Sequence, residues 1–151
     1  MSAGQTGKPI EILIVEDNPL DLEMTLRGLR KANIANHIHV ARDGAEALEF
    51  LFCEGAHAHR RMEDAPRFVL LDLKLPKVDG LEVLARLKAD ERTRAIPVVM
   101  LTSSKEQRDL IESYQLGVNS YIVKPVDFEN FVQAARELGT YWLMLNEIPA
   151  R

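Results

Sequence analysis

The chain is poor in cysteine: Cys53 stands alone, so no internal disulfide is possible. Such usage is typical of a reducing compartment, and we interpret Cys53 as a small buried apolar group rather than a redox centre. No apolar run approaches the roughly 20 residues that span a bilayer, and residues 1–9 lack the apolar stretch of a signal peptide. We therefore expect a soluble, cytoplasmic protein without membrane contact, in which residues 1–9 are disordered and residues 10–151 form one domain.

An excess of positive charge is also lacking. The 151 residues contain 19 Lys and Arg against 23 Asp and Glu, a formal net charge of −4. The two signs are mixed along the chain, and no block of like charge suggests a binding tail. An overall field that would draw the protein to nucleic acid is therefore excluded.

Short apolar runs alternate with longer segments of helical period, a pattern typical of an α/β fold with a parallel sheet. With 46% hydrophobic residues, the chain can build one sizeable core. We expect strands at residues 10–15, 37–41, 67–71, 98–102 and 120–123. We expect helices after Asn18-Pro19 and after Asp43-Gly44, and at residues 81–89, 105–116 and 127–146. Residues 54–66 have no convincing period and are expected to form a polar connection.

Polar side chains gather where the predicted strands end. Glu16 and Asp17 follow the first strand, Asp72 follows the third, Thr102 ends the fourth and Lys124 follows the fifth. Each of these residue types is common near strand ends, so the prediction depends on the ordered set. Because parallel strands direct their carboxyl ends to one edge of a sheet, we expect these groups to converge there.

Three carboxylates in one place repel one another and need a cation. Oxygen ligands favour a hard ion, Mg²⁺ or Mn²⁺, over Zn²⁺. Mg²⁺ commonly joins protein carboxylates to a phosphate, and an aspartate can act as a nucleophile and become an acyl phosphate. We therefore predict a phosphoryl site at Asp72, where the ion and Lys124 neutralise phosphoryl oxygens and Thr102 donates a hydrogen bond to one of them.

As an ordered set, these residues resemble the receiver domain of bacterial two-component response regulators, over about residues 10–138. The matching stretches are Ile14-Val15-Glu16-Asp17-Asn18, Leu70-Leu71-Asp72-Leu73-Lys74-Leu75-Pro76, Asp79-Gly80, Val99-Met100-Leu101-Thr102-Ser103 and Lys124-Pro125. The resemblance implies a flavodoxin-like receiver fold, a five-stranded doubly wound parallel sheet of strand order 2-1-3-4-5. It also implies a phosphoacceptor switch rather than an enzyme, with only self-phosphorylation and self-dephosphorylation chemistry.

The resemblance implies a role for each site residue. Asp72 matches the phosphoryl acceptor. Lys124 matches the lysine of the phosphoryl pocket, and its bond to Pro125 looks like the family's cis peptide. Thr102 and Tyr121 match the pair that moves on phosphorylation. The implied ligands of Mg²⁺ or Mn²⁺ are the carboxylates of Glu16, Asp17 and Asp72 and the backbone carbonyl of Lys74.

The chain departs from the family pattern in two places. Glu16 stands where many members have a second Asp, and the stretch between Asp17 and Asp72 is longer than in the minimal domain, with the excess in residues 54–66. That insertion and residues 141–149 resemble the small regulators that accompany bacterial and cyanobacterial phytochromes. The implied partner is a sensor histidine kinase and, at this finer level, a bacteriophytochrome.

The end of the chain bears on the output. Only about one helix follows Lys124, so we expect no attached DNA-binding domain. The expected output is docking to a downstream protein or phosphoryl transfer to a histidine phosphotransfer protein.

The predicted final helix has a broad apolar surface. An inward stripe is expected from Phe128, Phe131, Val132, Ala135, Leu138 and Trp142. Tyr141, Leu143, Met144 and Leu145 widen it, which favours a partner surface. We predict a homodimer with Tyr141, Trp142 and Leu145 at its interface; the alternative is a terminal helix folded back on its own domain.

Other interpretations concern the insertion and the activity. His57 and His59 have no evident third metal ligand and are expected to be solvent-exposed.

A haloacid-dehalogenase-like phosphatase also uses an aspartyl phosphate and Mg²⁺, but its Asp-x-Asp pattern after the first strand does not fit Glu16-Asp17-Asn18-Pro19. A constitutive interaction module would keep the fold without phosphorylation, and the complete site argues against it.

Overall fold

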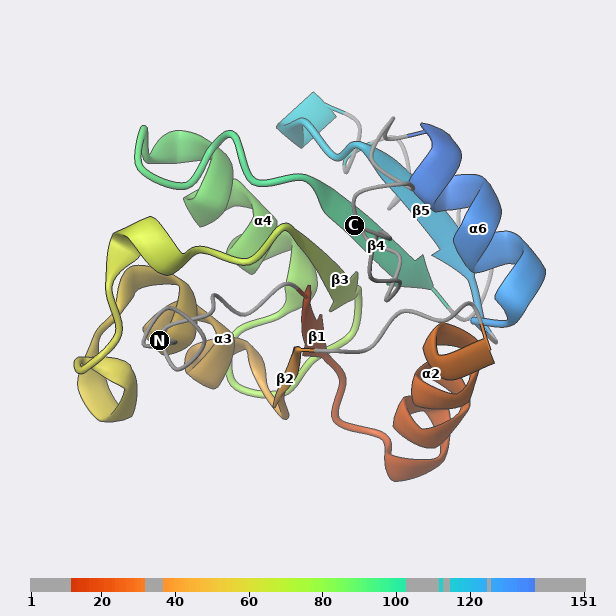
Figure 1. Ribbon diagram of the computed structural model, residues 1–151. Coiled ribbons are helices and arrows are strands. Elements are labelled where there is room, and N and C mark those ends of the chain that lie inside the picture. The colour runs from red at the N-terminus through yellow and green to blue at the C-terminus, as the bar shows by residue number, and fades with distance from the viewer. Residues whose placement is uncertain (1–11, 32–36, 103–111, 113–114, 125, 138–151) are drawn as a thin grey trace, which may run out of the picture.

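A parallel sheet carries the fold (Figure 1). The computed structural model describes residues 12–31, 37–102, 112, 115–124 and 126–137. Within them, five strands lie in the order β2-β1-β3-β4-β5, which confirms the predicted doubly wound topology. The strands are β1 Ile12–Val15, β2 Ile38–Ala41, β3 Phe68–Asp72, β4 Val98–Thr102 and β5 Ser120–Val123.

Helices cover both faces of this sheet. Helices α3 (Gly44–Phe52) and α4 (Gly80–Ala89) lie on one face. Helices α2 (Pro19–Lys31) and α6 (Phe128–Glu137) lie on the other. Because β1, β3 and β4 are buried on both faces, their sequences are nearly unbroken apolar runs rather than alternating patterns.

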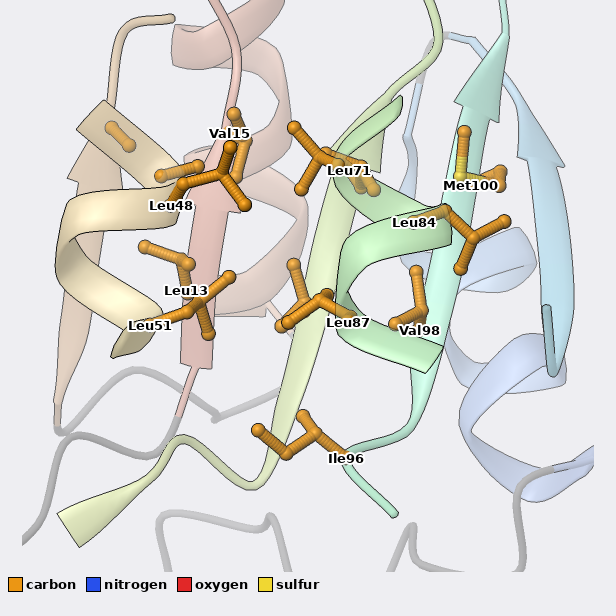
Figure 2. Close-up of a cluster of buried hydrophobic side chains, with 14 of the residues drawn as sticks. Leu13, Val15, Leu48, Leu51, Leu71, Leu84, Leu87, Ile96, Val98 and Met100 are labelled. Atoms are coloured by element: carbon orange, nitrogen blue, oxygen red, sulfur yellow. The ribbon is translucent and has the colours of Figure 1, made fainter. Parts of the chain in front are cut away.

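Alternate residues of each strand supply two separate cores. Leu13, Leu71 and Met100 point to the face covered by α3 and α4, where Leu51 and Leu84 meet them (Figure 2). The residues between them on the same strands point to the other face and pack against α2 and α6. Successive strand side chains point to opposite faces, so each strand anchors both helical layers.

The first turns of three helices are fixed by side-chain caps. Asn18 Oδ1 accepts a hydrogen bond from the Asp21 amide at 2.9 Å, as expected for the cap of α2. Asp43 Oδ1 accepts from the Glu46 amide at 2.7 Å, and Asp79 Oδ1 accepts from the Glu82 amide at 3.0 Å. Such caps satisfy amides that the helix itself leaves unpaired. The caps thus fix where α2, α3 and α4 begin, just after the carboxyl ends of β1, β2 and β3.

The insertion between α3 and β3 has more structure than its sequence indicates. Two 3₁₀ turns, η1 (Gly55–His57) and η2 (Met62–Asp64), occupy it. Arg60 fastens them to α3: its Nη1 donates to the Phe50 carbonyl, its Nη2 donates to the Asp64 carbonyl at 2.9 Å, and its guanidinium lies over the Phe50 ring. The prediction that His57 is solvent-exposed is wrong, because His57 packs edge-on against Phe50 with its side chain 14% exposed. His59 is exposed as predicted.

The predicted inward stripe of the last helix is partly wrong. Phe131 and Val132 are buried, but Phe128 is 37% exposed. Phe128 lines a surface hollow with Met24 and Gly28 of α2, so its side chain lies at the junction of α2 and α6 and not inside the core. Gly117 has φ +101° directly after a helical segment, a left-handed conformation in which glycine commonly ends a helix.

Several predictions fall outside the described residues. These are the disordered segment at 1–9, most of the helix at 105–116, the cis peptide at Pro125 and the interface residues Tyr141, Trp142 and Leu145. Among the described helices, none is long and apolar enough to cross a bilayer.

Candidate functional site

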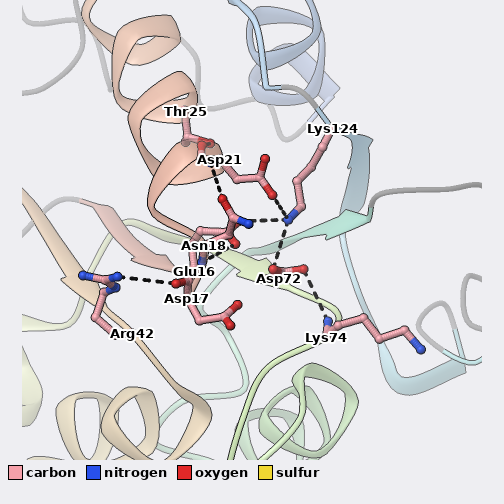
Figure 3. A network of polar contacts seen from close by, with 9 residues as sticks. All are labelled: Glu16, Asp17, Asn18, Asp21, Thr25, Arg42, Asp72, Lys74 and Lys124. Atoms are coloured by element: carbon pink, nitrogen blue, oxygen red, sulfur yellow. Dashed lines mark hydrogen bonds and ion pairs between the residues drawn. The ribbon is translucent and has the colours of Figure 1, made fainter.

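The strand ends bring the predicted polar residues together. Glu16 follows β1, Asp72 ends β3, Thr102 ends β4 and Lys124 follows β5. Since all the strands are parallel, these positions share one edge of the sheet, and Figure 3 shows the carboxylates of this edge around the Lys124 amino group. The predicted convergence of Glu16, Asp72 and Lys124 is therefore observed.

Lys124 is the centre of the cluster. Its Nζ donates to Glu16 Oε1 at 3.1 Å, to Asp72 Oδ2 at 3.0 Å and to Asp21 Oδ2 at 2.9 Å. The Lys124 amide donates to the Thr102 carbonyl at 2.7 Å, which ties the backbone of the lysine to the end of β4. Three acceptors satisfy the three donors of the ammonium.

Glu16 and Lys124 have pKa values shifted in the same direction. Burial, reinforced by the neighbouring Asp72, raises the pKa of Glu16 to about 7. Burial alone would lower the pKa of Lys124, but its hydrogen bonds to Asp21 and Asp72 outweigh that effect and hold the pKa above its ordinary value. The pocket thus keeps a permanent positive charge and has one carboxyl that titrates near neutrality.

Three carboxyl groups are placed to hold a metal ion. Ligand oxygens of Glu16, Asp17 and Asp72 lie within 4.8 Å of one another. Glu16 and Asp72 are buried whereas Asp17 is exposed, so the set opens toward solvent on the side of Asp17. Three anionic oxygens beside water suit a hard divalent ion that keeps part of its hydration shell.

Lys74, the second residue after β3, completes this side of the pocket. The amide of Lys74 donates to Asp72 Oδ1 at 3.3 Å and restricts the rotation of that carboxylate. The side chain of Lys74 is exposed and points away from Asp72 (Figure 3). The Lys74 carbonyl as a further protein ligand, beside the three carboxylates, stays a prediction.

Two contacts of the site were missed by sequence reasoning. Asp21 lies in the first turn of α2, four residues after Asp17, and bonds Lys124 directly. An acidic residue in the first turn of a helix is ordinarily explained by the helix dipole, so the sequence did not indicate that Asp21 belongs to the site. Arg42 Nη2 lies 3.4 Å from the Asp17 carbonyl, and nothing in the sequence pattern indicated this contact.

Thr102 and Tyr121 lie on neighbouring strands. Thr102 is buried, and its partner in the β4–β5 register is Val123, two residues beyond Tyr121. Tyr121 is half-buried and packs against the α3–α4 core, which also contains Met100. Because side chains two apart on a strand share a face, Thr102 and Tyr121 belong to the same face of the sheet.

Comparisons with known proteins agree with this geometry. The family described as response regulator receiver domain matches residues 12–136. The probable methanogenesis regulatory protein FilR2 of Methanothrix harundinacea is 44% identical over 93% of this chain and 88% of its own length. Response regulator Rcp1 of Synechocystis is 35% identical over 97% of both chains.

Solved structures give the same result. The bacteriophytochrome response regulator AtBRR has a TM-score of 0.82 at 55% identity, covering 93% of this chain and 99% of its own. The Mn²⁺-bound form of Rcp1 has a TM-score of 0.74 at 36% identity, covering 94% of this chain and all of its own. Regulators associated with phytochromes are thus among its homologues.

Proposed function

The chain belongs to the response regulator receiver family, and we propose that it is a phosphorylation switch in which Asp72 accepts the phosphoryl group. One observation carries the proposal: Glu16, Asp21 and Asp72 surround a single ammonium at the carboxyl edge of the sheet. Receiver domains bind divalent metals, and the donor set of this chain fits Mg²⁺ or Mn²⁺. The haloacid-dehalogenase alternative is not favoured by the comparisons.

The proposed chemistry is an in-line transfer to a carboxylate. An oxygen of Asp72 attacks phosphorus in a phosphohistidine, the P–N bond breaks, and the imidazole leaves with the electron pair and takes a proton. A divalent ion held by Glu16, Asp17 and Asp72 would neutralise charge on the phosphoryl oxygens. Lys124 stabilises the same charge from the other side, and the Lys74 amide holds the carboxylate in place. Positioning and electrostatics supply most of the catalysis in such transfers.

We further propose that Thr102 and Tyr121 convert this charge into a change of surface. A Thr102 hydroxyl drawn toward the phosphoryl group would vacate space that the Tyr121 side chain fills. The population of this active conformation would then rise to the extent that the phosphoryl group interacts more favourably with it than with the inactive one. Thr102→Ala should therefore still accept a phosphoryl group but lose phosphorylation-dependent binding of the partner. Phosphorylation-dependent partner binding at the wild-type level in Thr102→Ala would contradict this proposal.

The proposed donor is a sensor histidine kinase, and specifically a bacteriophytochrome, because AtBRR is a bacteriophytochrome response regulator of 55% identity. The proposed output is docking or onward transfer to a histidine phosphotransfer protein, in the cytoplasm. Homodimerisation through Tyr141, Trp142 and Leu145 stays a prediction, and sedimentation that gives only monomer at high concentration would contradict it.

Incubation with acetyl phosphate tests the proposed function. Intact mass should show one added phosphoryl group with Mg²⁺, much less without it, and none in Asp72→Asn. Sustained turnover of a generic phosphate ester would indicate the phosphatase instead. If Asp72→Asn matched the wild type in every partner assay, the chain would be a constitutive interaction module.

A further inference from the structure

A second group of metal-ligating side chains lies away from Asp72, on the edge strand of the sheet. His39 belongs to β2, Glu46 to the first turn of α3, and His57 to η1 of the insertion. One ligand atom from each side chain lies within 4.8 Å of the other two. We propose that these three residues form a site for a first-row transition metal ion, with Zn²⁺ as the probe that fits it.

The buried nitrogen of His39 is the observation that points to a ligand. His39 Nε2 is buried and makes no hydrogen bond, the one such side-chain atom among the described residues. A buried polar atom without a partner is costly and calls for an explanation. The ring cannot turn away easily, because it stacks on Phe50 with centroids 4.2 Å apart and planes 14° apart.

The other two ligands have atoms free to join it. His57 Nε2 lies 3.8 Å from Glu46 Oε2. Glu46 Oε1 is already engaged, since it accepts from the Arg42 amide at 3.0 Å, and this bond orients the carboxylate. His57 is held by its backbone, whose amide donates to the Glu54 carbonyl at 2.8 Å. The rings of His39 and His57 meet edge to face at 5.3 Å.

The donor chemistry selects the class of metal. Two imidazole nitrogens and one carboxylate oxygen suit Zn²⁺ and its first-row neighbours rather than Mg²⁺. With bonds of about 2.1 Å, tetrahedral ligands lie about 3.4 Å apart, so the His57–Glu46 separation needs to close only slightly. His57 and Glu46 are 14% and 34% exposed, so an ion can enter from solvent and retain a water as its fourth ligand.

A bound ion would join three successive elements of the chain, β2, α3 and η1. It would fasten the insertion to the edge strand and to α3. Arg60 already links the insertion to α3 without metal, through its hydrogen bond to the Phe50 carbonyl and the contact of its guanidinium with the Phe50 ring. This site is independent of phosphorylation and uses different residues from the Asp72 cluster.

Calorimetric titration of Zn²⁺ into the untagged, EDTA-treated full chain tests the proposal, with Mg²⁺ in excess to occupy the Asp72 cluster. One Zn²⁺ per chain is expected, with affinity falling at least tenfold in His57→Ala and in Glu46→Gln, which keeps an acceptor for the Arg42 amide. His59→Ala is the matched control and should bind as the wild type does. Co²⁺ should give a tetrahedral visible spectrum that His57→Ala lacks.

Three results would overturn the site. They are unchanged Zn²⁺ affinity in both His57→Ala and Glu46→Gln, loss of binding in Asp72→Asn or Cys53→Ser instead, and absence of Zn²⁺ binding at millimolar concentration. Far-ultraviolet circular dichroism of each variant separates loss of the ligand from loss of the fold.

Discussion

At the scale of single residues, Lys124 balances the charge of the pocket. Its side chain is 11% exposed and faces Glu16, Asp21 and Asp72 at 2.9–3.1 Å. Removing one partner of a buried ion cluster leaves the others unpaired, which is far more costly than losing an exposed pair. The folded state therefore depends on this cation to balance the carboxylates of the pocket.

We expect Lys124→Met to lower the free energy of unfolding by about 3 kcal/mol in EDTA, measured by urea denaturation. Lys77→Met is the control, because Lys77 is 68% exposed and pairs with Asp43 at 3.5 Å, so it should lose less than about 1 kcal/mol. Mg²⁺ should restore part of the loss in Lys124→Met. Equal losses in the two variants would show that the cluster does not need its cation.

Glu16 should make the metal-free protein less stable as pH rises. Its folded pKa of about 7 exceeds the ordinary 4.5, so between these values the folded state binds more protons than the unfolded state. The free energy of unfolding then falls with rising pH across this window, by up to about 1 kcal/mol per pH unit. The raised pKa of Lys124 does not contribute, since its ordinary value is already 10.5.

Urea denaturation of the wild type and Glu16→Gln in EDTA, from pH 5 to pH 8, measures this contribution. The wild type should lose stability relative to the variant as pH rises, and Mg²⁺ should reverse the trend because it binds the deprotonated carboxylate. Parallel pH profiles for the two proteins would contradict the raised pKa.

Sequence reasoning located most of the site residues but not their partners. Asp72, Glu16 and Lys124 could be predicted because each directly follows an apolar run. Asp21 and Arg42 could not, because both also have ordinary explanations as a helix residue and a surface cation. His57 was misjudged because its packing against Phe50 depends on the insertion folding back, which has no sequence period.

At the scale of elements, α4 begins in close contact with the end of β3. A Cβ on Gly80 would lie 2.2 Å from the Asp72 carbonyl oxygen and 2.9 Å from Leu73 Cα, both backbone atoms. The Gly80 amide also donates to the Leu73 carbonyl at 3.0 Å. The start of this helix and the position of Asp72 are therefore coupled.

We expect Gly80→Ala to lower the free energy of unfolding by about 2 kcal/mol or more through overpacking, and to slow phosphorylation by acetyl phosphate. Ala89→Gly, at the exposed last turn of α4, is the control; it should cost about 1 kcal/mol through helix propensity alone and leave the rate unchanged. A phosphorylation rate in Gly80→Ala equal to that of the wild type would show that the reactivity of Asp72 does not depend on the close contact between Gly80 and the end of β3.

The insertion depends on Arg60. Loss of its hydrogen bonds to the Phe50 and Asp64 carbonyls should cost about 1.4 kcal/mol or more of local stability. Arg60→Met should therefore speed limited proteolysis within residues 54–66 roughly tenfold, when opening is fast relative to cleavage. Arg61→Met is the matched control, because the Arg61 side chain is exposed and pairs with the exposed side chain of Glu63. Equal cleavage rates in Arg60→Met and Arg61→Met would show that the hydrogen bonds of Arg60 do not stabilise the insertion.

The elements themselves were predictable to different degrees. Strands at 98–102 and 120–123 have the predicted bounds because apolar, β-branched runs end there at polar residues. The order of the strands does not follow from such runs; it came from the resemblance to receiver domains. Phe128 was placed wrongly because helical period shows which face of a helix is apolar but not where along its length that face leaves the core.

At the scale of the whole molecule, the two cores hold the carboxyl edge of the sheet in one arrangement. α3 and α4 pack on one face and α2 and α6 on the other, so the chain segments that carry Glu16, Asp72, Thr102 and Lys124 cannot move independently. The phosphoryl group proposed at this edge would therefore act on elements of both layers, as a switch with a distant output requires.

Borohydride trapping tests the central claim most directly, because hydride reduces an aspartyl phosphate to homoserine and leaves a free carboxylate unchanged. After incubation with acetyl phosphate and Mg²⁺, peptide mass spectrometry should find homoserine at position 72, and not in EDTA. Homoserine at Asp17 or Asp21, or phosphate retained on a serine or histidine with Asp72 intact, would contradict the account.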